Sequence, residues 1–221
     1  MNLKDKMKKA WPTRDAMEQI YTMKLWGNND SDFYSGIGSH HPEIVNPYID
    51  VVSSYLETFE SPPVICDLGC GDFNVGENLV QYADKYIGVD IVEDLIEYNS
   101  RTFNHNNLDF QCLDIATDDL PVADIVILRQ VLQHLSNDEI QAILDKLYNY
   151  RFLVLTEHLP KGEFVPNKEI ISGQGTRLKK QSGVNLLAPP FNFKVKGEKK
   201  LLTITSEDNK GVIETTLYKI Y

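Results

Sequence analysis

The sequence has no long hydrophobic run and few cysteines, and each shortage excludes a class of protein. No apolar stretch in the 221 residues approaches the length of about 20 that spans a bilayer, and no apolar stretch follows the charged N-terminus. Neither a membrane span nor a signal peptide is therefore expected. The three cysteines are odd in number, which predicts reduced thiols in a cytoplasmic protein. Cys66 and Cys70 have no second Cys or His pair near them in sequence, so no metal site is predicted.

Basic charge is also scarce. Lys and Arg total 22 against 32 Asp and Glu, which gives a net charge of -10. A chain this acidic is a poor partner for nucleic acid, because such binding depends on neutralising phosphates. The one dense basic cluster, "LKDKMKKAW" at the start, is typical of a solvated helix or a frayed terminus. We therefore expect a small-molecule ligand, and a monomer or homodimer.

Apolar strands alternate with helical patterns along the middle of the chain. Continuously apolar strands separated by helices predict a parallel sheet with helices on both faces, and the length suits one α/β domain. Strands are expected at 64–69, 86–90, 108–114, 123–130 and 151–157, and helices at 14–26, 43–59, 75–84, 92–104 and after a capping box formed by Ser136 and Glu139.

The C-terminal third has a different pattern. The stretches "KLLTITSED" and "GVIETTLYKIY", joined by a turn, predict an antiparallel hairpin. Residues 158–198 hold several prolines and glycines with little periodicity, which is typical of a functional loop. A single domain over 1–221 is therefore expected, with N-terminal helices and a lid in 1–60, a core in 61–157, a substrate-side insertion in 158–198 and a hairpin in 199–221.

The stretch "VICDLGCGDFNVG" (64–76) joins the first strand to a glycine turn. Gly69 and Gly71 fit a dinucleotide fingerprint, but Asn74 stands where its third glycine belongs. Asp67 would repel a pyrophosphate and suits a cationic ligand such as S-adenosylmethionine, which carries an ammonium and a sulfonium. The turn therefore favours S-adenosylmethionine over a dinucleotide.

Acidic residues also follow the next two strands. Asp90 ends the second strand and can accept hydrogen bonds from ribose hydroxyls. Asp114 ends the third and can accept from an adenine amino group, with Ile115 beside the ring. Each acid alone is equally well explained as a cap or turn former, but an acid at the end of each of three successive strands indicates one adenosine site at the carboxyl edge of the sheet.

These motifs resemble those of class I S-adenosylmethionine-dependent methyltransferases. "VICDLGCGDFNVG" is similar to their first motif, "YIGVDIV" to the second, "FQCLDIATDDLP" to the acidic turn that holds adenine, and "ADIVILRQVLQHLSNDEI" to the fourth-strand motif. The resemblance implies a Rossmann-like sandwich with a mostly parallel seven-stranded sheet, an antiparallel C-terminal hairpin, and S-adenosylmethionine as cofactor with S-adenosylhomocysteine as product. The expected cofactor-binding residues are Asp67, Gly69, Cys70, Gly71, Asp90, Ile91, Asp114, Ile115, Arg129 and Gln130.

Two further segments resemble a subgroup of small bacterial methyltransferases. "SDFYSGIGSHHPEIVNPYI" is similar to an N-terminal Y-S-G-x-G-S lid segment that closes over the cofactor, and "PNKEIISGQGTRLKKQSGVNLLAPPFNF" to their C-terminal run. The resemblance implies that Tyr34, Ser39, Arg177 and Phe191 line the site. The alternative is that the glycines and prolines of these segments only shape loops.

Methyl transfer to a hydroxyl needs a base to remove its proton. His134 follows the fourth strand and His158 the fifth, so these are the candidate bases. His40 in the lid and Glu157 at the end of the fifth strand are candidate acceptor contacts, and Arg177 is a candidate clamp for an anionic acceptor.

The favoured function is methylation, most simply on oxygen, of a small polar metabolite such as a sugar or sugar-derived acid. N-methylation and protein methylation remain alternatives, although "RQVLQ" stands where many base-methylating enzymes carry Asn-Pro-Pro-Tyr. An NAD-linked oxidoreductase and a non-catalytic cofactor-binding module are alternatives of another class.

Overall fold

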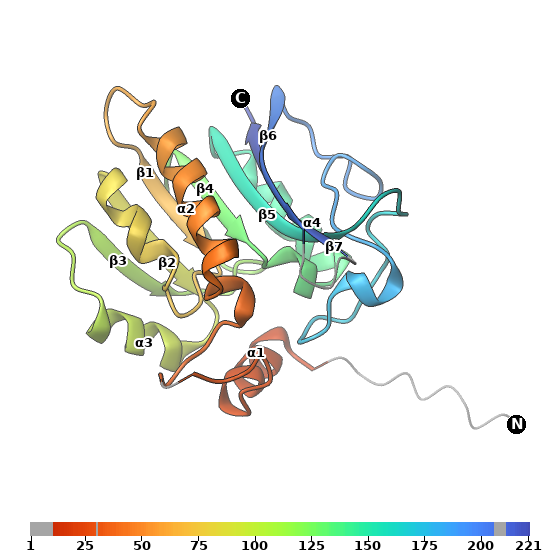
Figure 1. The fold of residues 1–221 in the computed structure, drawn as a ribbon, viewed down its shortest axis with the longest axis horizontal. Coiled ribbons are helices and arrows are strands. Elements are labelled where there is room, and N and C mark those ends of the chain that lie inside the picture. Colours follow the sequence, from red (N-terminus) through yellow and green to blue (C-terminus); the bar gives the residue numbers. More distant parts are fainter. Residues whose placement is uncertain (1–10, 30, 206–210) are drawn as a thin grey trace, which may run out of the picture.

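The structure is a computed structural model that describes residues 11–29, 31–205 and 211–221. Its strands form one seven-stranded sheet in the order β3-β2-β1-β4-β5-β7-β6 (Figure 1). Most of the N-terminal basic cluster and the turn of the C-terminal hairpin lie outside the described residues. The strands are β1 (Val64–Leu68), β2 (Lys85–Asp90), β3 (Leu108–Cys112), β4 (Ile125–Arg129), β5 (Phe152–Pro160), β6 (Gly197–Thr205) and β7 (Gly211–Lys219).

The directions of the strands confirm the predicted sheet. β1 to β5 run parallel, β7 pairs antiparallel with β5, and β6 pairs antiparallel with β7. In the register of β1 with its neighbours, Leu68 pairs with Val89 of β2 and with Leu128 of β4. The residues that follow β1, β2 and β4 therefore meet at one edge of the sheet.

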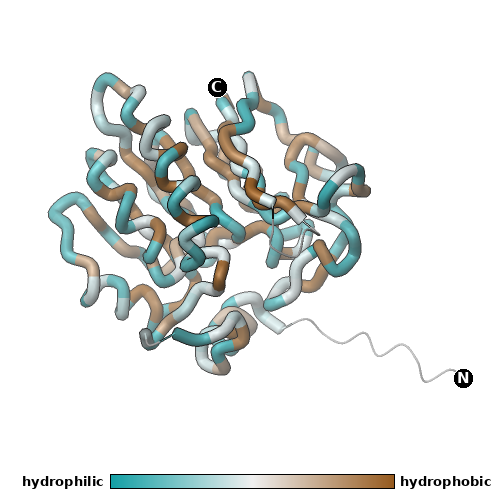
Figure 2. The backbone as a smooth tube through the Cα atoms, viewed as in Figure 1, coloured by the Kyte–Doolittle hydropathy of each residue, from teal (hydrophilic) through white to brown (hydrophobic). Residues whose placement is uncertain are grey.

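Helices cover both faces, because successive side chains of each buried strand point to opposite sides. Ile65 of β1 packs in a core with α2 and η2, whereas Cys66 packs in a core with α1 and α4. Figure 2 shows hydrophobic strands inside and hydrophilic segments outside. The helices are α1 (Thr13–Thr22), α2 (Pro42–Leu56), α3 (Glu93–Thr102) and α4 (Asn137–Leu147), with 3-10 helices η1 (Ile37–Ser39), η2 (Gly76–Tyr82), η3 (Leu132–His134) and η4 (Arg177–Lys180).

Two local expectations need correction. The segment predicted as a helix at 75–84 is the 3-10 helix η2, which is seven residues long and begins at Gly76, a residue of low helix propensity. β5 runs to Pro160, beyond its expected end at 157, because β7 pairs with it along its whole length. The predicted capping box is confirmed: Ser136 and Glu139 exchange side-chain and backbone bonds at the start of α4.

The irregular segment after β5 is held by buried polar side chains. Asn167 Nδ2 donates to the main-chain carbonyls of Asn185 and Pro189, and Asn167 Oδ1 accepts from the Asn185 N–H. Arg177 donates to the carbonyls of Leu132 and Leu135. A segment with little secondary structure is thereby fixed against the end of β4 and the start of α4.

Burial of α4 against the sheet yields a test of the fold. Leu144 is fully buried, with 0 % of its surface exposed. We expect Leu144→Ala to lower the free energy of unfolding by about 2–5 kcal/mol, because it leaves a cavity in the core. Asp145→Ala, at an exposed position of the same helix, should change it by less than about 0.5 kcal/mol. Urea denaturation measures both; equal losses would contradict the packing described here.

Candidate functional site

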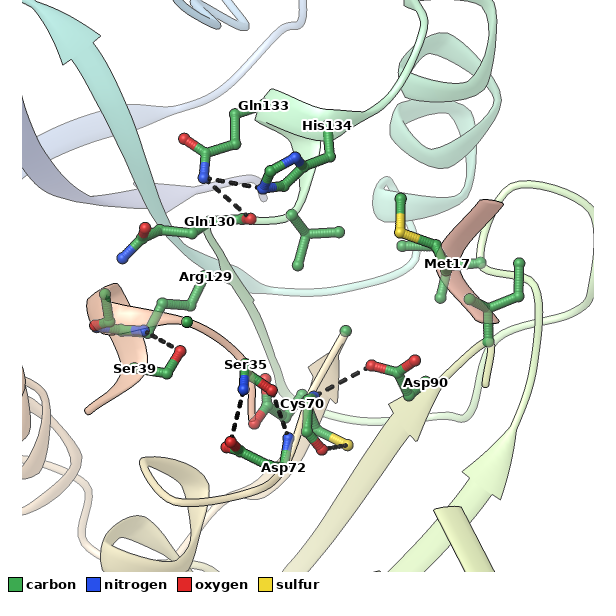
Figure 3. A pocket seen from close by; sticks show the side chains of 18 of the residues that line it. Met17, Ser35, Ser39, Cys70, Asp72, Asp90, Arg129, Gln130, Gln133 and His134 are labelled. Carbon is green, nitrogen blue, oxygen red and sulfur yellow. Dashed lines mark hydrogen bonds between the residues drawn. The ribbon is translucent and has the colours of Figure 1, made fainter. Parts of the chain in front are cut away.

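A cavity of about 350 Å³ lies at the carboxyl edge of β1 to β4, where the adenosine site was predicted. Its wall includes strand ends, α1 and residues 31–41, which were predicted to form a lid and are called the lid segment below (Figure 3). Most of the predicted site residues line it: Ser39, Asp67, Gly69, Cys70, Gly71, Asp90, Ile91, Asp114, Ile115, Arg129, Gln130 and His134.

Both glycines of the turn are required by close packing. Gly69 and Gly71 have φ of 78° and 57°, in the left-handed region that glycine tolerates. A Cβ on Gly69 would lie 2.4 Å from Val131 Cγ2, and one on Gly71 would lie 2.5 Å from Ser35 Oγ. The glycines therefore let the loop after β4 and the lid segment approach the turn.

The lid segment is latched to the loop that follows the glycine turn. The Ser35 N–H donates to Asp72 Oδ2 at 2.7 Å, and the Asp72 N–H donates to Ser35 Oγ at 2.8 Å (Figure 3). His40 Nε2 lies 2.6 Å from Asp72 Oδ2. Asn74 Nδ2 donates to the Ser39 carbonyl at 2.7 Å. Asn74, which breaks the dinucleotide fingerprint, is thus an anchor of the lid.

Two acids on neighbouring strands face the cavity with fixed geometry. Asp90 accepts from the N–H groups of Gly71 and Val92, each at 3.1 Å, and burial raises its pKa. Burial raises the pKa of Asp67 to about 6, while a hydrogen bond from the Tyr86 hydroxyl and the nearby Arg129 act in the opposite direction. Burial makes the charged forms of these two carboxylates unfavourable, and a bound cation would stabilise them.

Arg129 is the cation of the site. Its Nη1 donates to Ser39 Oγ at 3.2 Å, its Nη2 donates to the Gly38 carbonyl at 2.5 Å, and its guanidinium lies 4.9 Å from the centre of the Tyr48 ring. Among the described residues that line the cavity, no other Arg or Lys occurs. The guanidinium thus joins the end of β4 to the lid and faces an otherwise acidic cavity.

Gln130, the next residue, has a strained backbone conformation. Gln130 has a φ of 58°, and its Nε2 is buried without a hydrogen-bond partner. Its amide lies against Gly38, where a Cβ would come within 2.7 Å of the amide nitrogen. Such strain and an unpaired buried donor are typical of functional positions.

His134 is poised as a proton acceptor. Its Nδ1 lies 3.2 Å from the Gly173 carbonyl, which can only accept, so Nδ1 carries the proton and Nε2 the lone pair. Nε2 lies 3.3 Å from Gln133 Nε2 (Figure 3), and the ring lies 5.2 Å from that of Trp26. Burial lowers the pKa of His134 to about 4, so the imidazole is neutral at pH 7.

Glu139 joins three elements at the far wall of the cavity. It accepts from the N–H and hydroxyl of Ser136 at the start of α4, from the Ser172 hydroxyl in the insertion, and from the Thr13 hydroxyl in α1. These bonds lower its pKa against the opposing effect of burial. One carboxylate therefore holds α1 and the insertion over the cavity.

Arg177 and Glu157 were predicted as acceptor contacts, but their geometry gives them structural roles. Arg177 is 1 % exposed, and its guanidinium is bonded to main-chain carbonyls and to Asn137 Oδ1 rather than facing the cavity. Glu157 accepts from the N–H groups of Leu132 and Gln133, each at 3.0 Å. Burial raises the pKa of Glu157 to about 8. Both residues fix η3, the turn that carries His134.

The remaining predicted residues also lie outside the wall of the cavity. His158 is on β5 paired with Ile213 of β7, and a Cβ on Gly211 would lie 2.5 Å from its Nε2. Phe191 is buried in the hydrophobic core. Tyr34 packs against His40, with ring centres 4.5 Å apart, and His40 holds Asp72. The structure thus leaves His134 as the candidate base on the cavity wall.

Several lining residues were not predicted. They come from α1, the segment after it, η3 and the insertion: Thr13, Met17, Tyr21, Trp26, Gln133, Gln174 and Thr176. The amphipathic pattern of α1 was visible in the sequence, but it does not say which surface the helix covers. Ser35 stands inside the Y-S-G lid motif, so that motif could have identified it.

The described residues, which omit 1–10, 30 and 206–210, contain neither a candidate metal cluster nor a candidate membrane span. No group of three or more His, Cys, Asp or Glu is placed to hold a metal ion among these residues. None of their helices has the length and apolar character needed to cross a membrane.

The sheet order, the antiparallel β7 beside β5 and the cavity at the carboxyl edge define the fold of class I methyltransferases. Residues 65–150 match the family model described as "Methyltransferase domain". The match spans β1 to α4 and includes the glycine turn, Asp90, Asp114 and His134. It supports the predicted S-adenosylmethionine cofactor.

Comparison with known proteins adds one curated relative and several solved structures. The chain is 26% identical over 158 residues to a carboxy-S-adenosyl-L-methionine synthase of Helicobacter hepaticus, covering 65% of this chain and 64% of that protein. It is similar in fold to the N-methyltransferase NodS of Bradyrhizobium japonicum with S-adenosylhomocysteine (TM-score 0.66, 11% identity, 94% and 100% of the two chains). The N-terminal domain of EvdMO1 with S-adenosylhomocysteine also aligns (TM-score 0.61, 16% identity, 96% and 98%). At these identities the solved structures show the fold.

The role of Glu139 can be tested by a substitution that keeps the size of the side chain. We expect Glu139→Gln to lower the free energy of unfolding by about 1–3 kcal/mol, because an amide cannot accept all the bonds that meet at this carboxylate. It should also speed amide hydrogen exchange in α1 and in residues 170–176. Asp138→Asn, at an exposed position of the same turn, is the matched control. Unchanged exchange in both segments would contradict the role.

Proposed function

We propose that the protein is an S-adenosylmethionine-dependent methyltransferase that methylates a hydroxyl of a small polar metabolite, a sugar or sugar-derived acid. The observation that carries the proposal is the gathering of Asp67, Asp90 and Asp114 around one cavity beside the glycine turn. Carboxylates in these places suit an adenosine cofactor with cationic groups. Asp67, beside the glycine turn, opposes the pyrophosphate of NAD, which makes the oxidoreductase alternative unfavourable.

The cofactor supplies a methyl group on a sulfonium, and attack by the acceptor oxygen breaks the carbon–sulfur bond and leaves its electrons on sulfur. The protein's part is to bind, orient and exclude water. When the cofactor is bound, Asp90 and Asp114 would hold its ribose and its adenine, and Asp67 would hold its ammonium group. The latch between Ser35 and Asp72 closes the cavity over them.

His134 receives the proton of the acceptor hydroxyl at Nε2. The carbonyl of Gly173 fixes the tautomer that leaves this nitrogen free of hydrogen. An oxygen that is gaining a methyl group becomes strongly acidic, so a weak base is sufficient. A neutral amine would need no such base, and His134 therefore favours oxygen over nitrogen as the methylated atom.

The surroundings of His134 also bear on the acceptor. Trp26, Gln130, Gln133, Gln174 and Thr176 line the cavity with an aromatic face, amides and a hydroxyl. Such groups suit a polar molecule with hydroxyls. Because Arg177 donates to main-chain carbonyls, it does not bind an anionic group of the acceptor in this proposal. In this proposal residues 61–157 bind the cofactor, while 1–60 and 158–198 supply the lid and the acceptor side.

The proposal is tested by calorimetric titration with S-adenosylhomocysteine and with NAD. We expect only S-adenosylhomocysteine to bind. Its affinity should rise as the pH rises through about 6, where Asp67 loses its proton and can attract the ammonium group. Asp67→Asn should bind more weakly with no such rise, while the exposed control Asp50→Asn should match the wild type. Binding of NAD instead would refute the proposal.

The role of His134 is tested by methyl transfer to hydroxyl acceptors found by screening sugars and uronic acids. We expect His134→Gln to lower kcat by about 10²- to 10⁴-fold, the usual contribution of a positioned base, with unchanged affinity for S-adenosylhomocysteine. His105→Gln, at an exposed position, should behave as the wild type. Full activity in His134→Gln would show that His134 is not the base.

A further inference from the structure

The nitrogen of His134 that would receive the proton of the acceptor already has a hydrogen-bond partner. Gln133 Nε2 lies 3.3 Å from His134 Nε2 and 3.3 Å from the Gln130 carbonyl (Figure 3). Gln133 is 6 % exposed, and it lines the cavity beside His134. A buried amide thus stands between the candidate base and the space in which an acceptor would lie.

The other partners of Gln133 fix which end of its amide faces the histidine. Gln133 Oε1 lies 3.3 Å from the main-chain nitrogen of His158, which can only donate. Gln133 Nε2 lies beside the Gln130 carbonyl, which can only accept. A flipped amide would bring donor against donor and acceptor against acceptor. The amide nitrogen is therefore the atom that faces His134, and its second N–H donates to His134 Nε2.

The two ring nitrogens of His134 are thus constrained independently. The Gly173 carbonyl in the insertion requires a proton on Nδ1, and the Gln133 amide in η3 requires a lone pair on Nε2. We propose that Gln133 is a positioning residue for the base: its amide keeps Nε2 free of a proton until the hydroxyl of the acceptor displaces it. This inference rests on the proposed function, and it names the contact that the acceptor must replace.

A hydroxyl suits this exchange better than an amine does. Its hydrogen can be donated to His134 Nε2, and one lone pair of its oxygen can accept the N–H that Gln133 releases. A second lone pair remains to attack the methyl carbon. A neutral amine has one lone pair, so it cannot both accept from Gln133 and attack. The arrangement leaves no buried N–H unpaired when the acceptor is a hydroxyl.

Other titratable or charged groups lie on the elements around His134. Arg177 of η4 lowers the pKa of His134, in the same direction as burial. Glu157 of β5 accepts from main-chain N–H groups of η3, and Glu139 of α4 accepts from hydroxyls. Replacing Gln133 by Met leaves these charges in place. A change in the pKa of His134 in that variant therefore reports the lost hydrogen bond.

Nitrogen-15 NMR of protein with labelled histidines tests the inference without an acceptor, and the signals of His134 are assigned by their absence in His134→Gln. In the wild type at pH 7 we expect a proton on Nδ1 and none on Nε2. A donor to Nε2 competes with protonation, so Gln133→Met should raise the pKa of His134 by about 1, the equivalent of one hydrogen bond. Gln81→Met, the same change at an exposed position of η2, should leave it unchanged.

Two results would overturn the inference. The first is a proton on His134 Nε2 in the wild type, a measurement that needs no variant to fold. The second is an unchanged pKa of His134 in Gln133→Met.

Displacement by the acceptor is tested by the pH dependence of methyl transfer to an acceptor found in the screen of sugars and uronic acids. With S-adenosylmethionine kept saturating, the acid limb of kcat/KM reports the enzyme before the acceptor binds, and that of kcat reports the complex. Gln133→Met should move the limb of kcat/KM to higher pH by about 1 and leave that of kcat in place. A purely structural role would move both limbs or neither, and either result would contradict displacement.

Failure of the proposed function gives a different result. If S-adenosylhomocysteine did not bind, or if no sugar or uronic acid were methylated, the proposed function would fail and displacement by an acceptor with it. The NMR result would still decide whether Gln133 sets the proton on His134. If methyl transfer occurred and the pKa of His134 did not change in Gln133→Met, the function would stand and the role of Gln133 would not.

Discussion

The burial of several carboxylates at one edge of the sheet is the constraint on which the site depends. Asp67, Asp72 and Asp90 are brought together because parallel strands end at the same edge. Each is stabilised differently: Asp67 by a tyrosine hydroxyl, Asp90 by main-chain N–H groups, and Asp72 by the lid. The edge thus holds negative charge in a cavity whose only described Arg or Lys is Arg129, which suits a ligand that carries more positive than negative charge.

Closure of the cavity follows from the same carboxylates. Asp72 holds Ser35 and His40, and Arg129 holds Gly38 and Ser39. The lid segment is therefore held by charged groups at this edge of the sheet, in addition to the packing of Phe33 against the hydrophobic core. Glu139 holds α1 and the insertion from the other side. The same side chains therefore line the cavity and hold the lid segment, α1 and the insertion in place. A ligand that bonds to one of these side chains also affects the segment that the side chain holds.

The sequence was sufficient to predict the features that depend on local sequence patterns. The apolar strands, the capping box of α4 and the acids at the carboxyl ends of β1, β2 and β3 could all be predicted, because each depends on neighbours close in sequence. Arg177 was misassigned because its burial depends on the carbonyls of Leu132 and Leu135, which lie 45 and 42 residues away. An arginine in a glycine-rich segment has the same local pattern whether it faces a ligand or the main chain.

The contrast between Arg177 and Arg129 shows what distinguishes a structural cation from a ligand-binding one. The described bonds of Arg177 go to three main-chain carbonyls and one amide oxygen, a set that uses most of the guanidinium. Arg129 donates to one main-chain carbonyl and one serine hydroxyl, and it borders the cavity. A buried arginine whose donors are satisfied by the fold stabilises a loop, and here that loop carries His134. One whose donors remain partly unused and that borders the cavity is a candidate to bind an anionic group of a ligand.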